Sequence, residues 1–410
     1  MSEATPLVRG LADAGIARLV LDPTEPPPRA LARTGALRGA VWAGGRVTRA
    51  LGAAASSLPA LPALAWRGVD LGAAFASGAT RVFGTLLLGW QRYAEDLLMS
   101  WRRSGVRAVI VTDDCTATGR ARTLVAHRLG VPSIVVQHGV LMWIGDRNHE
   151  VGDYSAVWGP LVVKDFVDRG IAAERIAVVG WPTANARLPA IRDTAVRSRD
   201  LALILTTDLP VGTALVPEDA VEQVAAGAVA AIRGAGWSGR VAAKIHPGQD
   251  PLLYRDVFAA AGHPDIEVYG GRTDPWPLMA AARLVVTASS SIACALPHLG
   301  KRAVLYDVVR PPYAPYLARF AEFECAATPE TARHAVAGLM KGRRVDGRQR
   351  PLESAMDYAS QLRDADQRFA ELVSGAVRAG PVGQGALRRA LDVDAERPVA
   401  FDRLPRRAAS

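Results

Sequence analysis

Short apolar runs alternate with segments of helical spacing from residue 105 to residue 185. Apolar runs without polar interruptions are typical of strands buried on both faces, whereas apolar residues three and four apart are typical of the helices that cover them. The pattern predicts strands at 107–114, 132–139, 154–159 and 175–182, and helices at 120–130 and 160–170. Apolar strands that alternate with helices favour a parallel sheet.

The same alternation resumes at residue 201 and continues to residue 308. It predicts strands at 201–210, 240–248, 265–271, 283–291 and 302–308, and helices at 217–234, 251–261, 275–282 and 292–299. Residues 186–200 are charged and show no period, so we interpret them as a linker. The fold class that follows is α/β, with two Rossmann-like, doubly wound parallel-sheet domains in tandem, one within 1–185 and one within 199–345.

The amino-terminal region is less regular. The first strand candidate is 16–22, and a helical insertion near 30–104 follows it. Its least polar part, 51–66, contains Pro59 and Pro62 and is shorter than the ~20 residues that span a bilayer, so no transmembrane helix is expected. The Arg- and Trp-bearing apolar segments of the insertion favour helices that cover a sheet, and a helix resting on a membrane surface is the alternative.

Charge and cysteine content narrow the class of protein. The chain carries 49 Lys and Arg against 40 Asp and Glu, but only four of these cations are Lys and the Arg residues are scattered among Ala, Val and Gly. Scattered charge does not form a nucleic-acid-binding face, so no nucleic-acid partner is expected. Three widely spaced cysteines, Cys115, Cys294 and Cys325, favour a reducing compartment. The first residues are acidic where a signal peptide is basic, so we expect a cytoplasmic protein, with peripheral contact at the inner face of the membrane as the alternative.

Polar residues terminate most of the predicted strands. Parallel α/β sheets bind ligands outside the carboxyl ends of their strands, so these residues are the candidates for chemistry. They are Asp113, Asp114, Gln137, His138, Trp158, Gly159, Gly180, Pro182, Thr206 to Asp208, Lys244, His246, Thr287 to Ser291, Tyr306 and Asp307. Two domains whose loops face each other can enclose one donor and one acceptor, and a two-substrate enzyme is the hypothesis that follows.

The second domain carries the strongest indication of anion binding. Lys244 and His246 lie two residues apart at the end of one strand, and Gly248 allows close approach of the backbone. Three consecutive serines precede a predicted helix, whose free amides attract anions: Ser289, Ser290 and Ser291. The alternative is that one of these serines only caps that helix. Together with the Lys-x-His in the same sheet, they favour a phosphate site.

Several stretches in a fixed order carry a family resemblance. They are QHG at 137–139, the segment 152–182, KIHPG at 244–248 and the segment 282–307. In this order they resemble the GT-B glycosyltransferases of surface and capsular polysaccharide synthesis and the related CDP-glycerol glycerophosphotransferases, over residues 105–310. The arrangement is also similar to that of the non-hydrolysing UDP-N-acetylglucosamine 2-epimerases, which share the fold.

The resemblance implies a division of roles between the two domains. In these relatives the amino-terminal domain offers acceptor and catalytic groups, and the carboxyl-terminal domain holds the nucleotide donor in the cleft between them. The resemblance therefore assigns catalysis and acceptor binding to residues 1–185, and donor binding to residues 199–345. A last helix of GT-B folds often crosses back onto the first domain, and we expect this of the helices within 351–400, before a loose tail.

His138 is the residue that the resemblance marks as the base. The histidine of the His-Gly motif can accept a proton from the acceptor hydroxyl in related transferases, and this sequence matches the motif at His138 and Gly139. Gln137 then holds the ring or the substrate. A structural histidine bonded to a carbonyl is the alternative. Asp113 and Asp114 are the competing base, unless Asp114 only caps the following helix.

The donor groups follow from the same resemblance. Lys244 and His246 match the motif expected near the donor phosphates, and Ser289 to Ser291 match the phosphate-binding serines. Thr207 and Asp274 are candidates to touch the base, ribose or sugar, and each is equally well explained as a cap. No spacing of metal ligands is present, so we expect a metal-independent reaction without a cofactor. The predicted helix 292–299 lacks the acidic residue that grips the ribose in many relatives, which favours a donor other than a UDP-sugar.

We therefore expect a transferase that moves a sugar or a polyol phosphate from a nucleotide-activated donor to a hydroxyl acceptor in cell-surface glycan or glycoconjugate synthesis. The acceptor is a glycan, a lipid-linked molecule or a small molecule. A sugar-nucleotide 2-epimerase-like enzyme is one alternative, and an inactive binding module of the same fold is another.

Overall fold

The computed structural model places a defined part of the chain. It describes residues 65–66, 69–70, 89, 92–112, 114, 117–140, 151–194, 200–207, 219–271, 273–306, 316–343, 353–362 and 364–382. The strand candidate at 16–22, most of the helical insertion, Asp113, Asp208 and the expected tail lie outside the described residues. A short antiparallel pair, β1 (Ala65–Trp66) and β2 (Val69–Asp70), is described within the insertion.

The first domain is built on a four-stranded parallel sheet. Its strand order is β3-β4-β5-β6, with every neighbouring pair parallel. The strands are β3 (Val109–Val111), β4 (Ser133–Val136), β5 (Tyr154–Val157) and β6 (Ile176–Val178). The helices are α5 (Ala117–Leu129), α6 (Pro160–Asp168), the 3-10 helix η1 (Ala173–Arg175) and α7 (Pro182–Thr194). The four predicted strands and both predicted helices of this series are confirmed.

Residues 92–104 form a helix that packs on this domain. Its Leu97 and Trp101 are buried in a cluster with Val109 of β3 and Val125 of α5. For these residues the structure therefore bears out a helix that covers a sheet. No helix among the described residues has the length and apolarity that crossing a bilayer requires.

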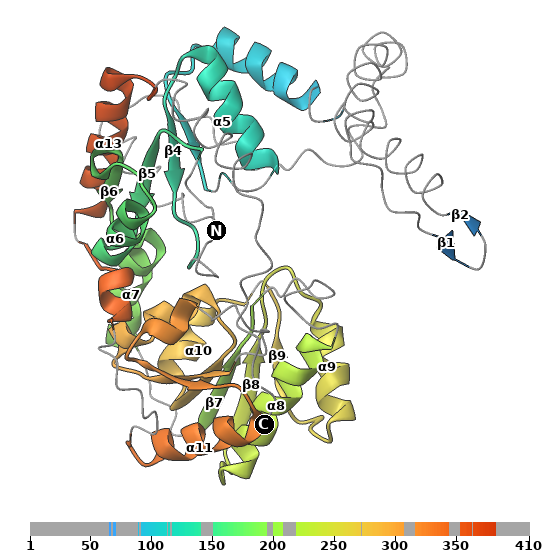
Figure 1. Ribbon diagram of the computed structural model, residues 1–410. Coiled ribbons are helices and arrows are strands. Elements are labelled where there is room, and N and C mark those ends of the chain that lie inside the picture. The colour runs from blue at the N-terminus through green and yellow to red at the C-terminus, as the bar shows by residue number, and fades with distance from the viewer. Residues whose placement is uncertain are drawn as a thin grey trace, which may run out of the picture.

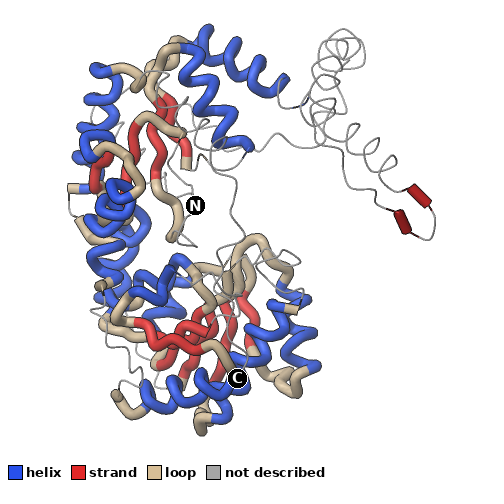
Figure 2. The backbone as a smooth tube through the Cα atoms, in the orientation of Figure 1, coloured by secondary structure: helices blue, strands red, loops and turns tan. Residues whose placement is uncertain are grey.

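The second domain is built on a six-stranded parallel sheet with the order β12-β11-β10-β7-β8-β9. The strands are β7 (Leu201–Leu205), β8 (Arg240–Lys244), β9 (Glu267–Tyr269), β10 (Leu284–Thr287), β11 (Ala303–Tyr306) and β12 (Phe323–Ala326). The α-helices are α8 (Ala220–Gly234), α9 (Pro251–Ala260), α10 (Pro275–Ala281) and α11 (Pro329–Met340). Figures 1 and 2 show the two domains one above the other, each with helices against its sheet. The predicted fold class is confirmed.

Two expectations about elements are corrected. The helix expected at 292–299 is two 3-10 helices, η2 (Ser291–Ala295) and η3 (Pro297–Leu299), because Pro297 has no amide hydrogen to continue an α-helix. Most of the linker expected at 186–200 is helical, because α7 continues to Thr194. The buried residues Ala184, Leu188 and Ile191 of this helix recur at helical spacing. Strand β12 and helix α11 extend the second domain beyond the elements that the hydrophobic pattern predicts.

A layer of aromatic rings joins the two domains. Trp158, directly after β5, stacks on Trp181 with ring centroids 4.6 Å apart, and Trp181 contacts Trp276 of α10 at 5.6 Å. Tyr358 of α12 (Ala355–Tyr358) meets the Trp158 ring edge-on. These rings belong to one buried cluster that also includes residues of β7 and β10, such as Leu205 and Val285, so the two domains share an apolar core.

Polar contacts tie the same interface together on α6. Arg319 of the 3-10 helix η4 (Tyr316–Arg319) donates from Nη1 to both carboxylate oxygens of Asp165, each at 3.0 Å. The Tyr316 hydroxyl also bonds to Asp165, and Arg319 pairs with Glu353. Burial raises the pKa of Asp165 above its ordinary value, although the neighbouring Arg319 opposes this shift.

The chain returns to the first domain at its carboxyl end. Helix α13 (Ala365–Ala379) buries Phe369 and Val373 against Ile134 of β4 and Ala156 of β5. Figure 1 shows α13 lying beside β5 and β6. After α13, the carbonyl oxygen of Gly380 accepts a hydrogen bond from the hydroxyl of Tyr154, the first residue of β5.

Candidate functional site

The loops that follow β4 and β10 contact each other across the two domains. The amide of Val140, four residues after the end of β4, donates to the Ser291 hydroxyl at 2.9 Å. A Cβ at Gly139 would lie 3.2 Å from the same hydroxyl oxygen, so a larger residue there would fit only if Ser291 shifted slightly. The His-Gly turn and the serine loop, predicted separately to carry chemistry, are therefore neighbours at the carboxyl edges of both sheets.

His138 is exposed and held through one nitrogen of its ring. Its Nδ1 lies 2.6 Å from the carbonyl oxygen of Thr112, which follows β3. A carbonyl oxygen only accepts hydrogen bonds, so Nδ1 carries a proton and the neutral ring keeps its lone pair on Nε2. The carbonyl contact that the structural alternative for His138 called for is thus present, and it leaves the ring in the tautomer that can accept a proton.

Gln137 is buried and engages both ends of its side-chain amide. Nε2 donates to the Gly139 carbonyl oxygen at 3.0 Å and to the Tyr358 hydroxyl at 2.9 Å, while Oε1 accepts from the Trp158 amide at 2.8 Å. The indole nitrogen of Trp158 also donates to the Gln137 carbonyl oxygen. These contacts hold the turn, and they give Gln137 a different role from contact with the His138 ring or a substrate.

The carboxylate of Asp114 is buried and bound to the backbone. It accepts from the amides of Val151 at 2.7 Å and Gly152 at 2.9 Å, on the connection that leads into β5. Its contacts are those of an anchor for that connection. Asp113, the other candidate base, lies outside the described residues.

Lys244 ends β8 and is buried at the carboxyl edge of the second sheet. Its Nζ donates to the carbonyl oxygen of Ile245 at 2.6 Å, and burial lowers the pKa of its ammonium group. The described residues contain no ion pair that includes Lys244. A buried cation without a carboxylate partner is costly, and a bound anion would offset that cost.

Thr287 lies in the same row of the sheet as Lys244. Lys244 pairs with Leu205 of β7, and Leu205 pairs with Thr287 of β10, so the three side chains project to one face. Two strand spacings separate Lys244 from Thr287, roughly 10 Å. The Thr287 hydroxyl is buried and has no hydrogen-bond partner among the described residues. Thr287 appears among the residues that end strands, but its sequence surroundings did not single it out.

The loop after β8 is folded around His246. The Gly248 amide donates to His246 Nδ1 at 3.2 Å, so a neutral ring carries its proton on Nε2, which suits a hydrogen bond to a phosphate oxygen. The His246 amide donates to the Thr206 hydroxyl, and that hydroxyl donates to Gln249 Oε1 at 2.9 Å. Thr206 and Gln249 therefore set the shape of a loop whose ligand-binding role was predicted from His246 and Gly248.

The three serines have distinct surroundings. Ser289 has a φ of 51°, in the left-handed region, and is buried. Ser290 occupies the position before η2 but its side chain makes no capping bond, and Ser291 accepts from Val140 of the other domain. Because η2 has only five residues in 3-10 geometry, the expected helix-end contribution to anion binding is withdrawn.

Thr207 and Asp274 complete the predicted donor residues. Thr207 is buried just after β7. Asp274 caps α10 by accepting from the Trp276 amide at 3.1 Å, and it pairs with Arg187 of α7 at 3.3 Å. Asp274 is therefore a helix cap, as the alternative interpretation held, and its ion pair with Arg187 also links the two domains.

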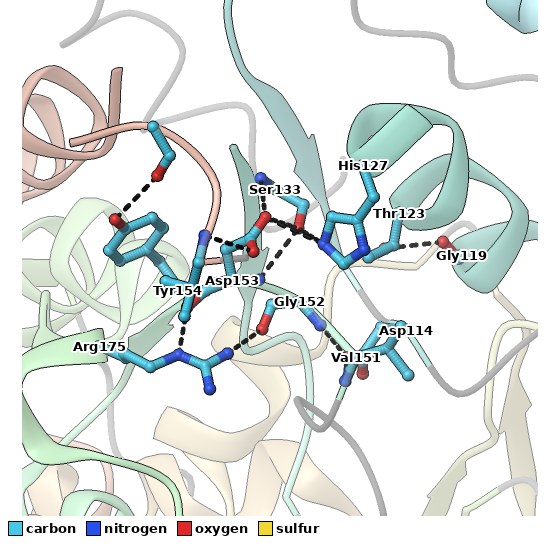
Figure 3. A network of polar contacts seen from close by, with 12 residues as sticks. Asp114, Gly119, Thr123, His127, Ser133, Val151, Gly152, Asp153, Tyr154 and Arg175 are labelled. Carbon is cyan, nitrogen blue, oxygen red and sulfur yellow. Dashed lines mark hydrogen bonds and ion pairs between the residues drawn. The ribbon is translucent and has the colours of Figure 1, made fainter. Parts of the chain in front are cut away.

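A second polar cluster lies at the opposite, amino-terminal edge of the first sheet (Figure 3). The Asp153 carboxylate oxygen Oδ2 accepts from the Ser133 amide at 2.9 Å and hydroxyl at 2.7 Å, and lies 3.0 Å from His127 Nε2. The other oxygen accepts from the Val382 amide at 2.9 Å. His127 approaches both partners through one nitrogen, unlike the central histidine of a catalytic triad, so we interpret the cluster as structural. No local motif in the sequence indicated it.

No group of three or more His, Cys, Asp or Glu side chains that could hold a metal ion occurs in the described part of the chain. Metal independence stays a prediction. Cys294 is buried in the apolar core, where burial raises the pKa of its thiol, and Cys325 is exposed.

Comparisons with known proteins bear on the fold. No protein-family model matches the chain, and no curated protein matches it either. Among solved structures, the S. aureus MnaA–UDP complex is similar with a TM-score of 0.50 and 15% identity, over 75% of this chain and 82% of that chain. The Methanocaldococcus jannaschii UDP-GlcNAc 2-epimerase in complex with UDP-GlcNAc and UDP is similar with a TM-score of 0.49 and 13% identity, over 70% of this chain and 81% of that chain. The wall teichoic acid polymerase TagF is similar with a TM-score of 0.39 and 14% identity, over 61% of this chain and 69% of that chain.

Identities this low speak to the fold alone. The resemblance to glycerophosphotransferases in particular is not shown by these comparisons. The chain has the GT-B fold, in which two parallel-sheet α/β domains stand in tandem.

Proposed function

We propose that this protein is an enzyme that acts on a nucleotide-activated sugar, and that it transfers the sugar or a polyol phosphate to a hydroxyl acceptor. The observation that carries the proposal is the contact between the His138 turn and the serine loop through Val140 and Ser291. It brings the turn that carries His138 next to the serine loop of the second domain, whose sheet also carries Lys244 at the end of β8. The similar S. aureus MnaA structure contains UDP, which supports a nucleotide as the donor part.

The proposed reaction uses the tautomer of His138. The acceptor hydroxyl attacks the donor at the bond to the leaving phosphate, and its proton passes to His138 Nε2. The broken bond leaves its electron pair, and a negative charge, on the nucleotide phosphate. Lys244, His246 and Ser290 supply a cation and hydrogen-bond donors for that charge, and they are held by the sheet and its loops before the substrate arrives.

Binding of nucleotides is the first test. Calorimetry and thermal unfolding against UMP, UDP, CMP, CDP, GDP and TDP, with and without EDTA, identify the donor class. A ligand at a hundred times its dissociation constant stabilises the fold by about 2.7 kcal/mol. We expect one nucleotide to bind selectively and equally well in EDTA, and Lys244→Met to weaken that binding. Lys164→Met is the matched control, because Lys164 is exposed and forms an ion pair with Asp168 on its own helix. If no nucleotide binds, the proposal is wrong.

Product analysis separates transfer from the other activities that this fold supports. Incubation with the donor sugar, with and without a hydroxyl acceptor, is followed by chromatography and NMR of the sugar. We expect nucleotide release to depend on the acceptor. Conversion of the sugar's stereochemistry without an acceptor would replace the transferase by an epimerase, and binding without any turnover would leave a binding module.

A further inference from the structure

The carboxyl-terminal segment 353–362 reaches the turn that carries His138. Tyr358 of this segment is fully buried, and its hydroxyl accepts a hydrogen bond from Gln137 Nε2 at 2.9 Å. Gln137 precedes His138 directly, and the two residues of the contact are 221 positions apart in the chain. A residue far outside the first domain's sequence thus completes the hydrogen bonding of the turn.

The same segment covers part of the ligand-binding edge of the first sheet. Beyond β5, the carbonyl oxygen of Trp158 accepts from the Ser360 amide at 3.2 Å, and beyond β6 the Trp181 amide donates to the Ser360 carbonyl oxygen at 2.9 Å. Gly159 has no room for a Cβ, because the carbonyl oxygens of Asp357 and Tyr358 stand there. An acceptor at this edge therefore approaches over β3 and β4, where His138 lies.

The geometry of the Gln137 amide explains how Tyr358 acts on the turn. One Nε2 hydrogen bonds to the Tyr358 hydroxyl and the other to the Gly139 carbonyl oxygen, while Oε1 accepts from the Trp158 amide. Without the Tyr358 hydroxyl, a buried amide hydrogen loses its partner. It regains one only by rotating, which disturbs the contact with Gly139 and the backbone that aims the His138 ring at Thr112.

We propose that Tyr358 is a positioning residue for His138, acting through Gln137, and that segment 353–362 is thereby part of the reaction site. The proposal rests on the proposed function in one respect, that His138 accepts the proton of the acceptor hydroxyl. Tyr358 itself touches neither substrate nor the reacting atoms.

Tyr358→Phe tests the proposal, because it removes the hydroxyl and keeps the ring in the aromatic layer. We expect kcat to fall about tenfold, the scale of one lost hydrogen bond, while the KM for the nucleotide donor stays within about twofold. Tyr154→Phe is the matched control. It removes another tyrosine hydroxyl that ties the carboxyl-terminal segment to the same sheet, at Gly380, and both kinetic constants should stay unchanged.

NMR of the His138 ring gives a readout that does not depend on activity. In the wild type and in Tyr154→Phe, the Nδ1 proton bonded to Thr112 should give a resonance protected from exchange, and in Tyr358→Phe that protection should be lost. If the ring signals and kcat of Tyr358→Phe equal those of Tyr154→Phe, the positioning role is refuted. If the wild type neither binds nor turns over a nucleotide sugar, the proposed function fails instead, and the NMR comparison still decides the role of Tyr358.

Discussion

Replacing Asp153 with asparagine removes the carboxylate on which the polar cluster of the first domain converges. Ser133, at the start of β4, donates to it from both its amide and its hydroxyl, and His127, near the end of α5, bonds to the same oxygen. Val382, beyond α13, donates to the other oxygen. One side chain thus joins a strand, a helix and the carboxyl-terminal segment.

The size of the effect follows from which contacts asparagine can keep. Its amide oxygen can still accept from one side, but its NH2 group then faces donors that need an acceptor. A hydrogen bond to a charged group contributes about 1.5–3 kcal/mol, and the Asp153 carboxylate accepts several such bonds. We expect Asp153→Asn to lower the free energy of unfolding of the first domain by about 3 kcal/mol at pH 7.

The pH dependence of this loss has a defined direction. Burial alone would raise the pKa of Asp153, but the hydrogen bonds from His127 and Ser133 outweigh it and hold the pKa below the ordinary 3.8. A carboxyl group with a lowered pKa in the folded state stabilises the fold above its unfolded pKa, and this contribution is lost as the pH falls through the folded pKa. The difference between wild type and Asp153→Asn should therefore narrow below about pH 4.

Urea unfolding followed by tryptophan fluorescence measures the difference, at pH 7 and at a series of lower pH values. Asp168→Asn is the control, because Asp168 is exposed in an ion pair with Lys164 and its loss should cost less than about 1 kcal/mol. An Asp153→Asn variant no less stable than Asp168→Asn would show that the cluster does not hold the domain together.

Three further predictions concern the site and the joint between the domains. His138→Ala should lower the single-turnover transfer rate at least about a hundredfold and leave nucleotide affinity, measured by calorimetry, within a few-fold. Lys244→Met should raise the melting temperature of the free protein, because burial disfavours the charged ammonium group. In the wild type, nucleotide affinity should fall as the pH rises through the lowered pKa of Lys244, because the ammonium group then loses its charge. Arg319→Met leaves the partly buried Asp165 without its cation and should lower stability by about 1.5–3 kcal/mol in scanning calorimetry, whereas Arg368→Met, at an exposed position of α13, should change it little.

The fold was predictable where burial on both faces makes a strand continuously apolar. Ile134 to Val136 and Leu201 to Leu205 are examples, and both form central strands. Prediction failed where a polar or cyclic residue hides or breaks a period. Arg187 and Pro189 hide the helical spacing of α7, while Pro297 ends a helix that the neighbouring apolar residues favour.

The candidate site was predictable only in its local part. His138, Lys244 and Ser290 stand within four residues of the end of an apolar run, so their position at a sheet edge follows from the pattern. The partner of Gln137 does not, because Tyr358 reaches it through the packing of the carboxyl-terminal segment. A hydrogen bond between residues so far apart in sequence changes neither the hydrophobic periodicity nor any local motif around either residue, so the sequence gives no sign of it.

The amino edge of the first sheet and the carboxyl edge of the second sheet differ in how fully their buried polar groups are hydrogen-bonded, and this difference bears on where ligands bind. At the amino edge of the first sheet, both oxygens of Asp153 accept hydrogen bonds, as expected of a buried polar group that only stabilises. At the carboxyl edge of the second sheet, the Thr287 hydroxyl lacks a partner among the described residues, and the buried Lys244 has only a carbonyl. The other unpartnered donors of the described region include Trp181 Nε1, which lies at the joint between the domains. Buried polar groups are costly when unsatisfied, so their retention beside the serine loop favours an anionic ligand that satisfies them when bound.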